Sequence, residues 1–223
     1  MSARPSSIAA IYAEKPVQYF ASARPDIVAL LETNSDGAIL ELGCGAGGTG
    51  RAAIAAGKAG RYVGIELDRN AAAAASEILS EVLVGDVQEL DLTQYRGRFD
   101  ALIISEVLEH LTDPWTTLKT LVECLKPNGA VFASSPNIAH WAVVKELIFG
   151  RFAYADVGVM DRTHLRWFTP DSYRHMFEGA GVEVSSIRPL VPPRWKARTI
   201  NRLTGGRFHH LVVVQIMIEG RRR

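Results

Sequence analysis

Short apolar runs alternate with stretches of helical periodicity along the first two thirds of the chain. The runs are bounded by Gly, Pro, Asn or Asp, which favours strands, and the stretches between them favour helices. The expected strands are Ala38–Leu42, Tyr62–Glu66, Val82–Val84, Phe99–Ser105 and Ala130–Ser134, and the expected helices are Gly50–Ala56, Asn70–Ile78 and Trp115–Leu125. This alternation predicts a parallel sheet with helices on both faces.

The last part of the chain has a different pattern. A helix is expected at Pro170–Ala180, followed by strands at Val182–Ile187 and Leu211–Ile218. The connection between these strands, Pro189–Gly206, is rich in proline and arginine and offers no obvious crossover helix. We therefore expect an antiparallel pair at one edge of a seven-stranded, mostly parallel sheet.

One α/β domain over residues 1–223 accounts for this pattern, because the chain is long enough for a sizeable core and short for two domains. Its expected parts are a helical cap at 1–37, a cofactor-binding core at 38–135, an insertion at 136–169, and a C-terminal helix and β-hairpin at 170–223. The insertion is too long for a plain connection, and it is rich in aromatic residues and histidine. We expect it to form a substrate lid.

Composition and charge exclude several classes of protein. Hydrophobic residues make up 48% and the formal net charge is +1, so the chain is globular and nucleic acid is disfavoured as a partner. Cys44 and Cys124 give no disulfide framework or zinc spacing. No membrane partner is expected, because the longest apolar run, Leu211–Ile218, is too short to span a bilayer. With no signal-peptide core at Met1–Ser7, a cytoplasmic location is expected.

The C-terminal part is distinctly basic. We interpret this part as a solvated face, with a docking surface for an anionic partner as the alternative. The oligomeric state cannot be predicted. The residues concerned are Arg194, Lys196, Arg198, Arg202, Arg207 and the terminal Arg221–Arg223.

A glycine-rich loop follows the first strand, in Gly43-Cys44-Gly45-Ala46-Gly47. Glycines allow a sharp turn and the close approach of a ligand, and the next helix offers unpaired N–H groups. Taken alone the loop is ambiguous, because Gly43, Gly45 and Gly48 also match the spacing of a dinucleotide-binding loop. An NAD-dependent oxidoreductase and a non-catalytic nucleotide-binding module therefore stay open.

Three carboxylates narrow the choice of cofactor. Glu66 ends the second strand, where it can accept hydrogen bonds from two ribose hydroxyls, and NAD enzymes share this device. Asp86 follows the third strand in Gly85-Asp86-Val87, placed to accept from an adenine amino group. Glu41, just before the glycines, is unusual for an NAD loop.

These motifs resemble those of class I S-adenosylmethionine-dependent methyltransferases, most closely over residues 38–135. The resemblance implies a Rossmann-like doubly wound fold, with the glycines beneath the methionine part, Glu66 at the ribose, and Asp86 and Val87 flanking the adenine. In this family a helix often packs over the cofactor before the first strand, and there Arg24 is either a partner of its carboxylate or a surface arginine. The implied cofactor-binding residues are Tyr19, Arg24, Glu41, Gly43, Cys44, Gly45, Gly47, Glu66, Leu67, Asp86, Val87 and Ser105.

The segment after the fourth strand, Glu106-Val107-Leu108-Glu109-His110, contains candidate metal ligands. If Glu106 begins a helical turn, Glu109 and His110 lie on its face, and His164 is the best further ligand, with His140 second. Carboxylates favour Mg²⁺ or Mn²⁺, and more imidazole favours Zn²⁺ or Fe²⁺. Two alternatives stay open: His110 or His164 as a metal-free general base, and a purely structural role. Asp161 could orient His164 or act alone.

This spacing resembles Glu-x-x-Glu-His in ubiquinone-pathway O-methyltransferases and small-RNA 2′-O-methyltransferases, which implies Glu106, Glu109, His110 and His164 as ligands. The stretch from Asp161 to Thr169 also resembles bacterial methyltransferases often found with glycosyltransferases. We therefore predict O-methylation of a sugar-containing or other polyhydroxylated small molecule, which would be the partner of the chain. A phenolic quinone precursor is the second expectation and an RNA end the third. The alternative is a metal-independent O- or N-methyltransferase of a small metabolite with a histidine base.

Overall fold

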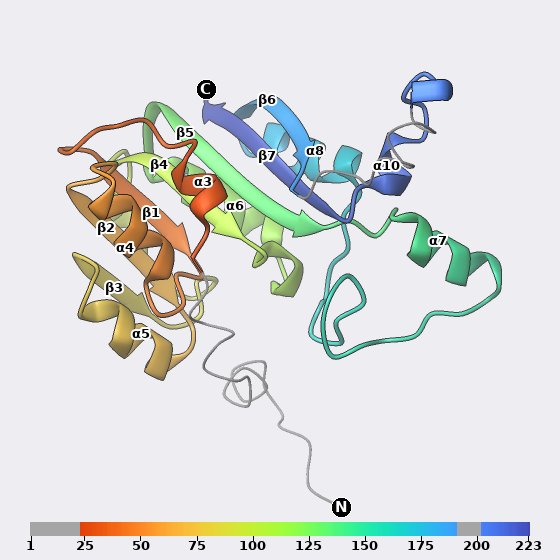
Figure 1. The fold of residues 1–223 in the computed structure, drawn as a ribbon. Coiled ribbons are helices and arrows are strands. Elements are labelled where there is room, and N and C mark those ends of the chain that lie inside the picture. The colour runs from red at the N-terminus through yellow and green to blue at the C-terminus, as the bar shows by residue number, and fades with distance from the viewer. Residues whose placement is uncertain (1–22, 191–201) are drawn as a thin grey trace, which may run out of the picture.

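A computed structural model describes residues 23–190 and 202–223, arranged around one seven-stranded sheet (Figure 1). The strand order is β3-β2-β1-β4-β5-β7-β6, in which β7 alone is antiparallel to its neighbours. The strands are β1 (Ala38–Leu42), β2 (Arg61–Glu66), β3 (Glu81–Val84), β4 (Phe99–Ser105), β5 (Leu125–Pro136), β6 (Val182–Pro189) and β7 (Gln215–Arg222). The mostly parallel sheet predicted from the sequence is confirmed.

Helices cover both faces of the sheet, as predicted. The helices are α3 (Pro25–Val28), α4 (Gly48–Ala55), α5 (Arg69–Ser76), α6 (Pro114–Glu123), α7 (Trp141–Ile148), α8 (Pro170–Gly179) and α10 (His209–Val212), with short 3₁₀ helices η1 (Thr93–Tyr95) and η2 (Leu108–His110). Several of them begin at a capping residue. Asp68 caps α5, Asp113 caps α6, and Thr169 forms a capping box with Ser172 at α8.

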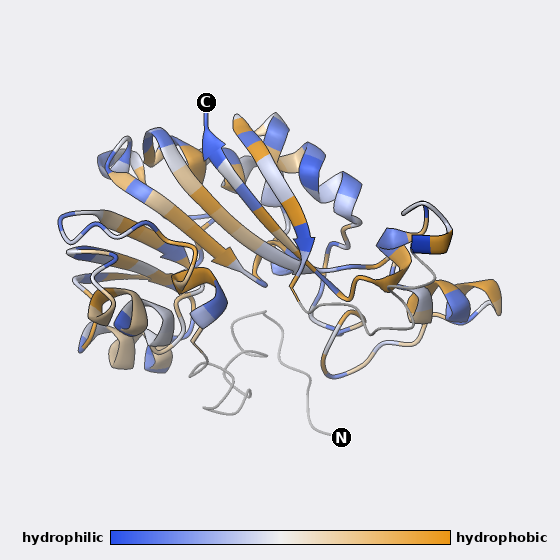
Figure 2. Cartoon of the chain, turned by 45° about the horizontal axis from the view of Figure 1, so that its top comes forward, coloured by the Kyte–Doolittle hydropathy of each residue, from blue (hydrophilic) through white to orange (hydrophobic). Residues whose placement is uncertain are grey.

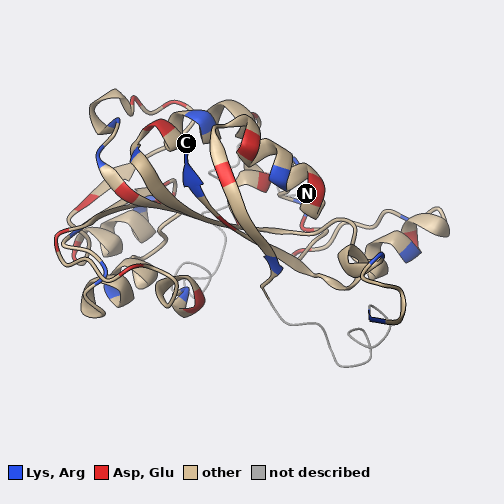
Figure 3. Ribbon diagram, turned by 90° about the horizontal axis from the view of Figure 1, so that it is seen from above, with Lys and Arg blue, Asp and Glu red and all other residues tan. Residues whose placement is uncertain are grey.

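Two apolar clusters lie on opposite faces of the sheet, because successive strand side chains point in opposite directions. Leu40 and Leu102 belong to the cluster that includes α6 and α8, while their neighbours Ile39 and Ile103 belong to the one that includes α3, α4 and α5. The central strands are strongly apolar in Figure 2, and the charged residues are mainly in helices, loops and strand ends in Figure 3. The central strands are therefore buried on both sides, as a parallel sheet requires.

The end of the chain differs from the expected strand Leu211–Ile218. His209–Val212 is helical, and β7 runs from Gln215 to Arg222 between β5 and β6. The strand extends into polar residues because backbone hydrogen bonds to two neighbouring strands fix it. Charged side chains at its end also have partners: Glu219 pairs with Arg188 at 2.7 Å. A second difference concerns β5, which begins at Leu125 rather than Ala130, so residues 126–129 also belong to the strand.

An arm extends beyond the carboxyl ends of the strands (Figure 1). It comprises residues 138–167, including α7, and its root is fixed by Asn137, which is fully buried. The Asn137 amide donates to the carbonyls of His210 and Val213, both at 2.7 Å, and its backbone N–H donates to Val214. This one residue therefore connects the arm to the segment before β7. No helix in 23–190 or 202–223 has the length and apolar character needed to cross a membrane.

Candidate active site

The glycine loop connects β1 to α4 at the carboxyl ends of the strands. Gly43, Gly45 and Gly47 all have positive φ, at 73°, 53° and 81°. A Cβ at Gly43 would lie 2.5 Å from Cγ2 of Val107, so the loop packs directly on the segment after β4. This contact places the candidate cofactor loop beside the candidate metal ligands.

Glu66 reaches back to the glycine loop from the end of β2. Its carboxylate accepts from the N–H of Gly45 at 2.8 Å and from the N–H of Asp68 at 2.9 Å. Burial raises the pKa of this carboxyl despite both hydrogen bonds. Leu67, half-buried, lies between Glu66 and the α5 cap. Glu66 therefore stands at the edge where a ribose is expected.

Asp86 lies beyond β3, where its carboxylate accepts from the N–H of Gln88 at 2.9 Å. Val87 is buried and packs into the core cluster of α6 and α8. The two residues predicted to flank an adenine therefore occupy a loop at the carboxyl end of β3, one half-exposed and one buried.

Glu41 is buried in β1 and accepts from the hydroxyl of Tyr62, on β2, at 2.9 Å. Burial raises the pKa of Glu41 to about 7, and the hydrogen bonds from Tyr62 and Thr49 oppose this rise. Cys44 is also buried, and its sulfur lies against Gly64. Tyr62 was not predicted as a site residue. A carboxylate inside a buried strand needs a donor, and this requirement was the available signal.

Arg24 lies inside the site rather than on the surface. Its guanidinium donates to the hydroxyls of Ser105 and Ser134, at the ends of β4 and β5, and pairs with Asp26 at 2.8 Å. Its backbone N–H donates to Thr49 on α4. Arg24 therefore brings a positive charge to the carboxyl edge, next to Ser105. Tyr19, the other residue predicted from this part of the chain, lies outside the described residues.

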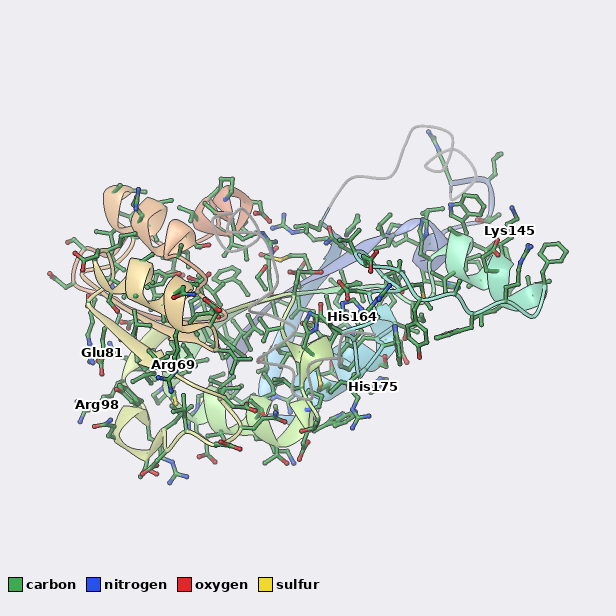
Figure 4. The ribbon with its side chains drawn as sticks, turned by 90° about the horizontal axis from the view of Figure 1, so that it is seen from below. Arg69, Glu81, Arg98, Lys145, His164 and His175 are labelled. Carbon is green, nitrogen blue, oxygen red and sulfur yellow. The ribbon has the colours of Figure 1, made fainter. Side chains whose placement is uncertain are left out.

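Within 23–190 and 202–223, three side chains able to ligate a metal converge: Glu109, His110 and His164. One ligand atom of each lies within 4.8 Å of the others, and all three residues are buried. The two imidazole rings meet edge to face with centroids 4.7 Å apart. His164 comes from the root of the arm, near the middle of the molecule (Figure 4). His140 lies at the start of α7 instead, outside this cluster.

Backbone carbonyls orient both histidines. Nδ1 of His110 lies 3.2 Å from the carbonyl oxygen of Thr163, and Nδ1 of His164 lies 3.1 Å from that of Val159. When Nδ1 donates to a carbonyl, the Nε2 atom of the neutral ring carries the lone pair. Both contacts therefore favour the tautomer in which Nε2 is the ring nitrogen able to ligate a metal.

Asp161 acts on His110 through Thr163. Its carboxylate accepts from the backbone N–H and the hydroxyl of Thr163, at 2.9 and 2.8 Å. The carbonyl of Asp161 accepts from the backbone N–H of His164 at 3.0 Å. The sequence suggested a role for Asp161 in orienting His164, and the structure adds Thr163, which was not predicted.

Glu106 precedes η2 and has a left-handed backbone, with φ of 55°. The helical turn considered from the sequence thus begins only at Leu108, and Glu106 lies outside the cluster of three. Its Oε2 accepts from Gln215 on β7 at 3.2 Å. Its Oε1, like Oε1 of Glu109, is buried without a hydrogen-bond partner in the described part of the chain. Gln215 was missed because it lies 109 residues away along the chain.

The two carboxyl groups after β4 are strongly affected by burial. Burial raises the pKa of Glu109 well above its usual value, and the negative charge of Glu106 adds to the rise. Burial also raises the pKa of Glu106, against hydrogen bonds from Ser134 and Gln215. The site therefore holds two carboxyl groups whose negative charge, when they ionise, is not fully balanced by hydrogen bonds.

The arm is fixed to this site by backbone contacts. The N–H groups of Leu165 and Arg166 both donate to the carbonyl of Glu109, at 2.8 and 3.0 Å. The guanidinium of Arg166 lies over the ring of Trp115, 5.6 Å from its centroid. Asp161, Thr163 and His164 are thus held near η2 by the residues that directly follow them.

Comparisons with known proteins show the family to which the chain belongs. A profile of the methyltransferase-domain family matches residues 16–187, well over half of the chain. The ubiquinone biosynthesis O-methyltransferase of Aromatoleum aromaticum is 25% identical over 158 residues, covering 67% of this chain and 65% of that protein. Its counterpart in Idiomarina loihiensis is 25% identical over 178 residues, covering 75% and 72%. The chain thus spans just under two thirds of the Aromatoleum relative.

A solved S-adenosylmethionine-dependent methyltransferase from Mesorhizobium loti shares the fold. Its TM-score is 0.63 at 18% identity, covering 89% of this chain and 96% of that one. The resemblance drawn from the glycine loop, Glu66 and Asp86 is confirmed: the chain belongs to the methyltransferase-domain family, as a class I S-adenosylmethionine-dependent methyltransferase.

Proposed function

We propose that the chain transfers the methyl group of S-adenosylmethionine to a hydroxyl of a small polyhydroxylated acceptor, with a divalent cation at Glu109, His110 and His164. The observation that carries this proposal is the convergence of these three buried side chains within 4.8 Å. A phenolic acceptor is the second candidate, since the relatives are named ubiquinone biosynthesis O-methyltransferases.

The residues of the site suit a cation. Two imidazoles and the carboxylate of Glu109 form a donor set that zinc, iron or manganese accepts, and magnesium would use mainly the carboxylate. Oε1 of Glu109 is buried without a hydrogen-bond partner in the described part of the chain. A cation at the cluster would compensate this oxygen. When bound, it would lower the pKa of the acceptor hydroxyl at neutral pH.

The chain's own residues have separate tasks in this proposal. The glycine loop, Glu66 and Asp86 would hold the donor, and Gly43 packs on Val107, two residues before Glu109. The carbonyl of Thr163, 3.2 Å from Nδ1 of His110, orients the ring of that histidine. Because methyl transfer is an in-line displacement, this alignment and the exclusion of water by the arm supply much of the rate.

The aromatic part of the arm supports an acceptor with a ring. Phe152, Tyr154 and Trp167 form a cluster with centroid distances of 5.4 to 6.4 Å. Trp167 is three residues from His164, so this cluster lies next to the proposed ligands along the chain. Such faces suit the C–H groups of a sugar or a phenolic ring.

A specific observation favours the metal-free alternative. His110 is already oriented by Thr163 and Asp161, as a general base would be. In that case His110 itself takes the proton of the acceptor hydroxyl, and Glu109 stabilises the imidazolium that results.

One experiment separates these candidates. Methyl transfer from labelled S-adenosylmethionine would be measured on panels of glycosides, catechols and amines, with Mg²⁺, Mn²⁺, Fe²⁺ or Zn²⁺ and with EDTA. The proposal predicts transfer to a hydroxyl that EDTA abolishes. Full transfer in EDTA would instead identify the histidine base, and transfer to amines alone would reject O-methylation.

A variant pair tests the ligand set directly. Glu109→Gln removes a carboxylate with little change in volume and is expected to weaken Mn²⁺ binding, measured by calorimetry, at least about tenfold. Glu89→Gln changes an exposed carboxyl in the same domain and should bind Mn²⁺ as the parent does. Equal Mn²⁺ binding by all three proteins would exclude Glu109 as a ligand.

A further inference from the structure

The arm exposes large apolar side chains that the proposed chemistry does not use. Ile148 is 75% exposed, and Trp141, Phe149 and Val157 are each more than half exposed. Soluble surfaces seldom gather side chains of this kind, and where they do the patch marks a contact with a partner or a lipid surface. Lys145, on α7, lies at the far end of the molecule from Arg69, and His164 lies between them (Figure 4).

A second apolar element lies beside this arm. All views place the segment of residues 202–212 on the same side as α7, beyond the carboxyl ends of the strands (Figures 1 and 4). Leu203 is 81% exposed and Phe208 is 46% exposed. Asn137 joins the two elements at their common root through His210 and Val213. They form one projecting surface, which we call the apolar tip.

The apolar tip also carries a net positive charge. Residues 138–167 and 202–212, which form the arm and the second element, contain six Lys or Arg residues and three Asp or Glu residues. The rest of the chain is net acidic, because the whole carries only +1. Within the tip, Arg202, Arg207 and Lys145 are exposed, while Arg151 pairs with Glu146 and Arg162 pairs with Asp156. The surplus charge of the tip is therefore positive.

We propose that the apolar tip docks on the surface of an anionic lipid bilayer. Aliphatic and aromatic side chains with neighbouring cations are the combination that an interfacial contact requires. Trp141 suits the headgroup level, and Ile148 and Phe149 suit the hydrocarbon below it. The expectation of no membrane partner rested on the lack of a spanning run, and an interfacial contact needs none.

Other occupants fit these observations less well. Nucleic acid would match the positive charge, but it binds through cations and aromatic stacking and would leave the aliphatic side chains of Leu147, Ile148 and Val157 exposed. A second copy joined about a two-fold axis would bring residues 202–212, which contain two arginines and neither Asp nor Glu, near their own equivalent, and this costs electrostatic energy. A bilayer with anionic headgroups satisfies both the apolar and the charged features.

The contact also has a consequence for the site. Asp161, Thr163 and His164 lie in the same arm as the tip, and the N–H groups of Leu165 and Arg166 fix this part of it to Glu109. Docking would therefore hold the cluster close to the membrane surface. The binding itself does not depend on methyl transfer, so it can be tested without an acceptor.

The test is flotation of the full chain with vesicles of phosphatidylcholine alone, or mixed equally with phosphatidylglycerol. The chain is expected to float with the anionic vesicles, less with the neutral ones, and less again at high salt. The double variants I148D/F149D and R202E/R207E should each lower the bound fraction about tenfold. Ile54→Asp on α4 and Arg69→Glu on α5 are matched controls on the opposite end and should float as the parent does.

Binding of S-adenosylhomocysteine, measured by calorimetry, checks that each variant is folded. The proposal is wrong if the parent floats with neither vesicle, or if the controls lose as much binding as the tip variants. A concentration-dependent dimer that I148D/F149D abolishes, with no flotation, would assign the tip to a second copy. Binding of single-stranded RNA that R202E/R207E abolishes, without flotation, would assign it to nucleic acid.

Discussion

The buried carboxyl of Glu41 gives a quantitative prediction about stability. Burial raises its pKa to about 7 from 4.5, so the folded protein keeps the proton while the unfolded chain releases it. A group whose pKa is raised on folding stabilises the protein below the unfolded pKa and loses that contribution as the pH rises through the folded pKa. Each pKa unit corresponds to about 1.4 kcal/mol, so ionised Glu41 lowers the free energy of unfolding by about 3 kcal/mol.

Glu41→Gln removes this dependence on pH and keeps an oxygen that can accept from Tyr62. The free energy of unfolding would be measured by urea titration of both proteins between pH 4.5 and pH 8. We expect the variant to gain on the parent by about 3 kcal/mol across this range, mostly between pH 4.5 and pH 7. Comparing the two proteins cancels the contributions of Glu66, Glu106 and Glu109, which titrate in both.

The control is Glu89→Gln, which changes an exposed carboxyl. Its stability curve is expected to run parallel to that of the parent. If Glu41→Gln also gives a parallel curve, the Glu41 carboxyl is not held protonated by burial. If Glu41→Gln instead loses stability relative to the parent as the pH rises, folding lowers the pKa of Glu41, which contradicts the effect of burial.

Three further predictions concern single positions. Gly43→Ala should weaken binding of S-adenosylhomocysteine, measured by calorimetry, at least about tenfold, because its Cβ would lie 2.5 Å from Val107. The control Gly57→Ala is also at positive φ but faces open space, so it should leave this binding unchanged and cost about 1 kcal/mol of stability. Asn137→Ala should lower the free energy of unfolding, measured in urea, by about 2 to 4 kcal/mol, because two buried carbonyls lose their donor. An unchanged value would contradict the role of Asn137 in connecting the arm to the segment before β7. Tyr173→Phe should cost about 1 kcal/mol for its buried hydrogen bond to Ser134, and a thermal shift of zero would exclude that bond.

The parallel part of the sheet could be predicted because each strand there is buried on both faces and its pattern is local. Ala38–Leu42 and Phe99–Ser105 have the bounds that the sequence indicated. The end of the chain could not be predicted in this way. The apolar run beginning at Leu211 contains a short helix, and β7 is fixed by pairing with β5 and β6, which are distant in sequence.

In the candidate site, too, the residues placed by local sequence could be predicted, and those placed by contacts distant in sequence could not. Glu66, Asp86 and Glu109 follow strand ends, so topology alone brings them to one edge of the sheet. Thr163 and Gln215 were missed, because their contacts with His110 and Glu106 join residues 53 and 109 positions apart. A left-handed backbone at Glu106 was not foreseeable either, because this conformation is uncommon for any residue with a side chain.

The central claim is that the glycine loop holds S-adenosylmethionine, and calorimetric titration of the whole chain tests it most directly. The parent would be titrated separately with S-adenosylhomocysteine and with NAD, and Glu66→Gln with both. We predict saturable binding of S-adenosylhomocysteine that Glu66→Gln weakens, with no heat from NAD. Tight binding of NAD with no response to S-adenosylhomocysteine would contradict the account.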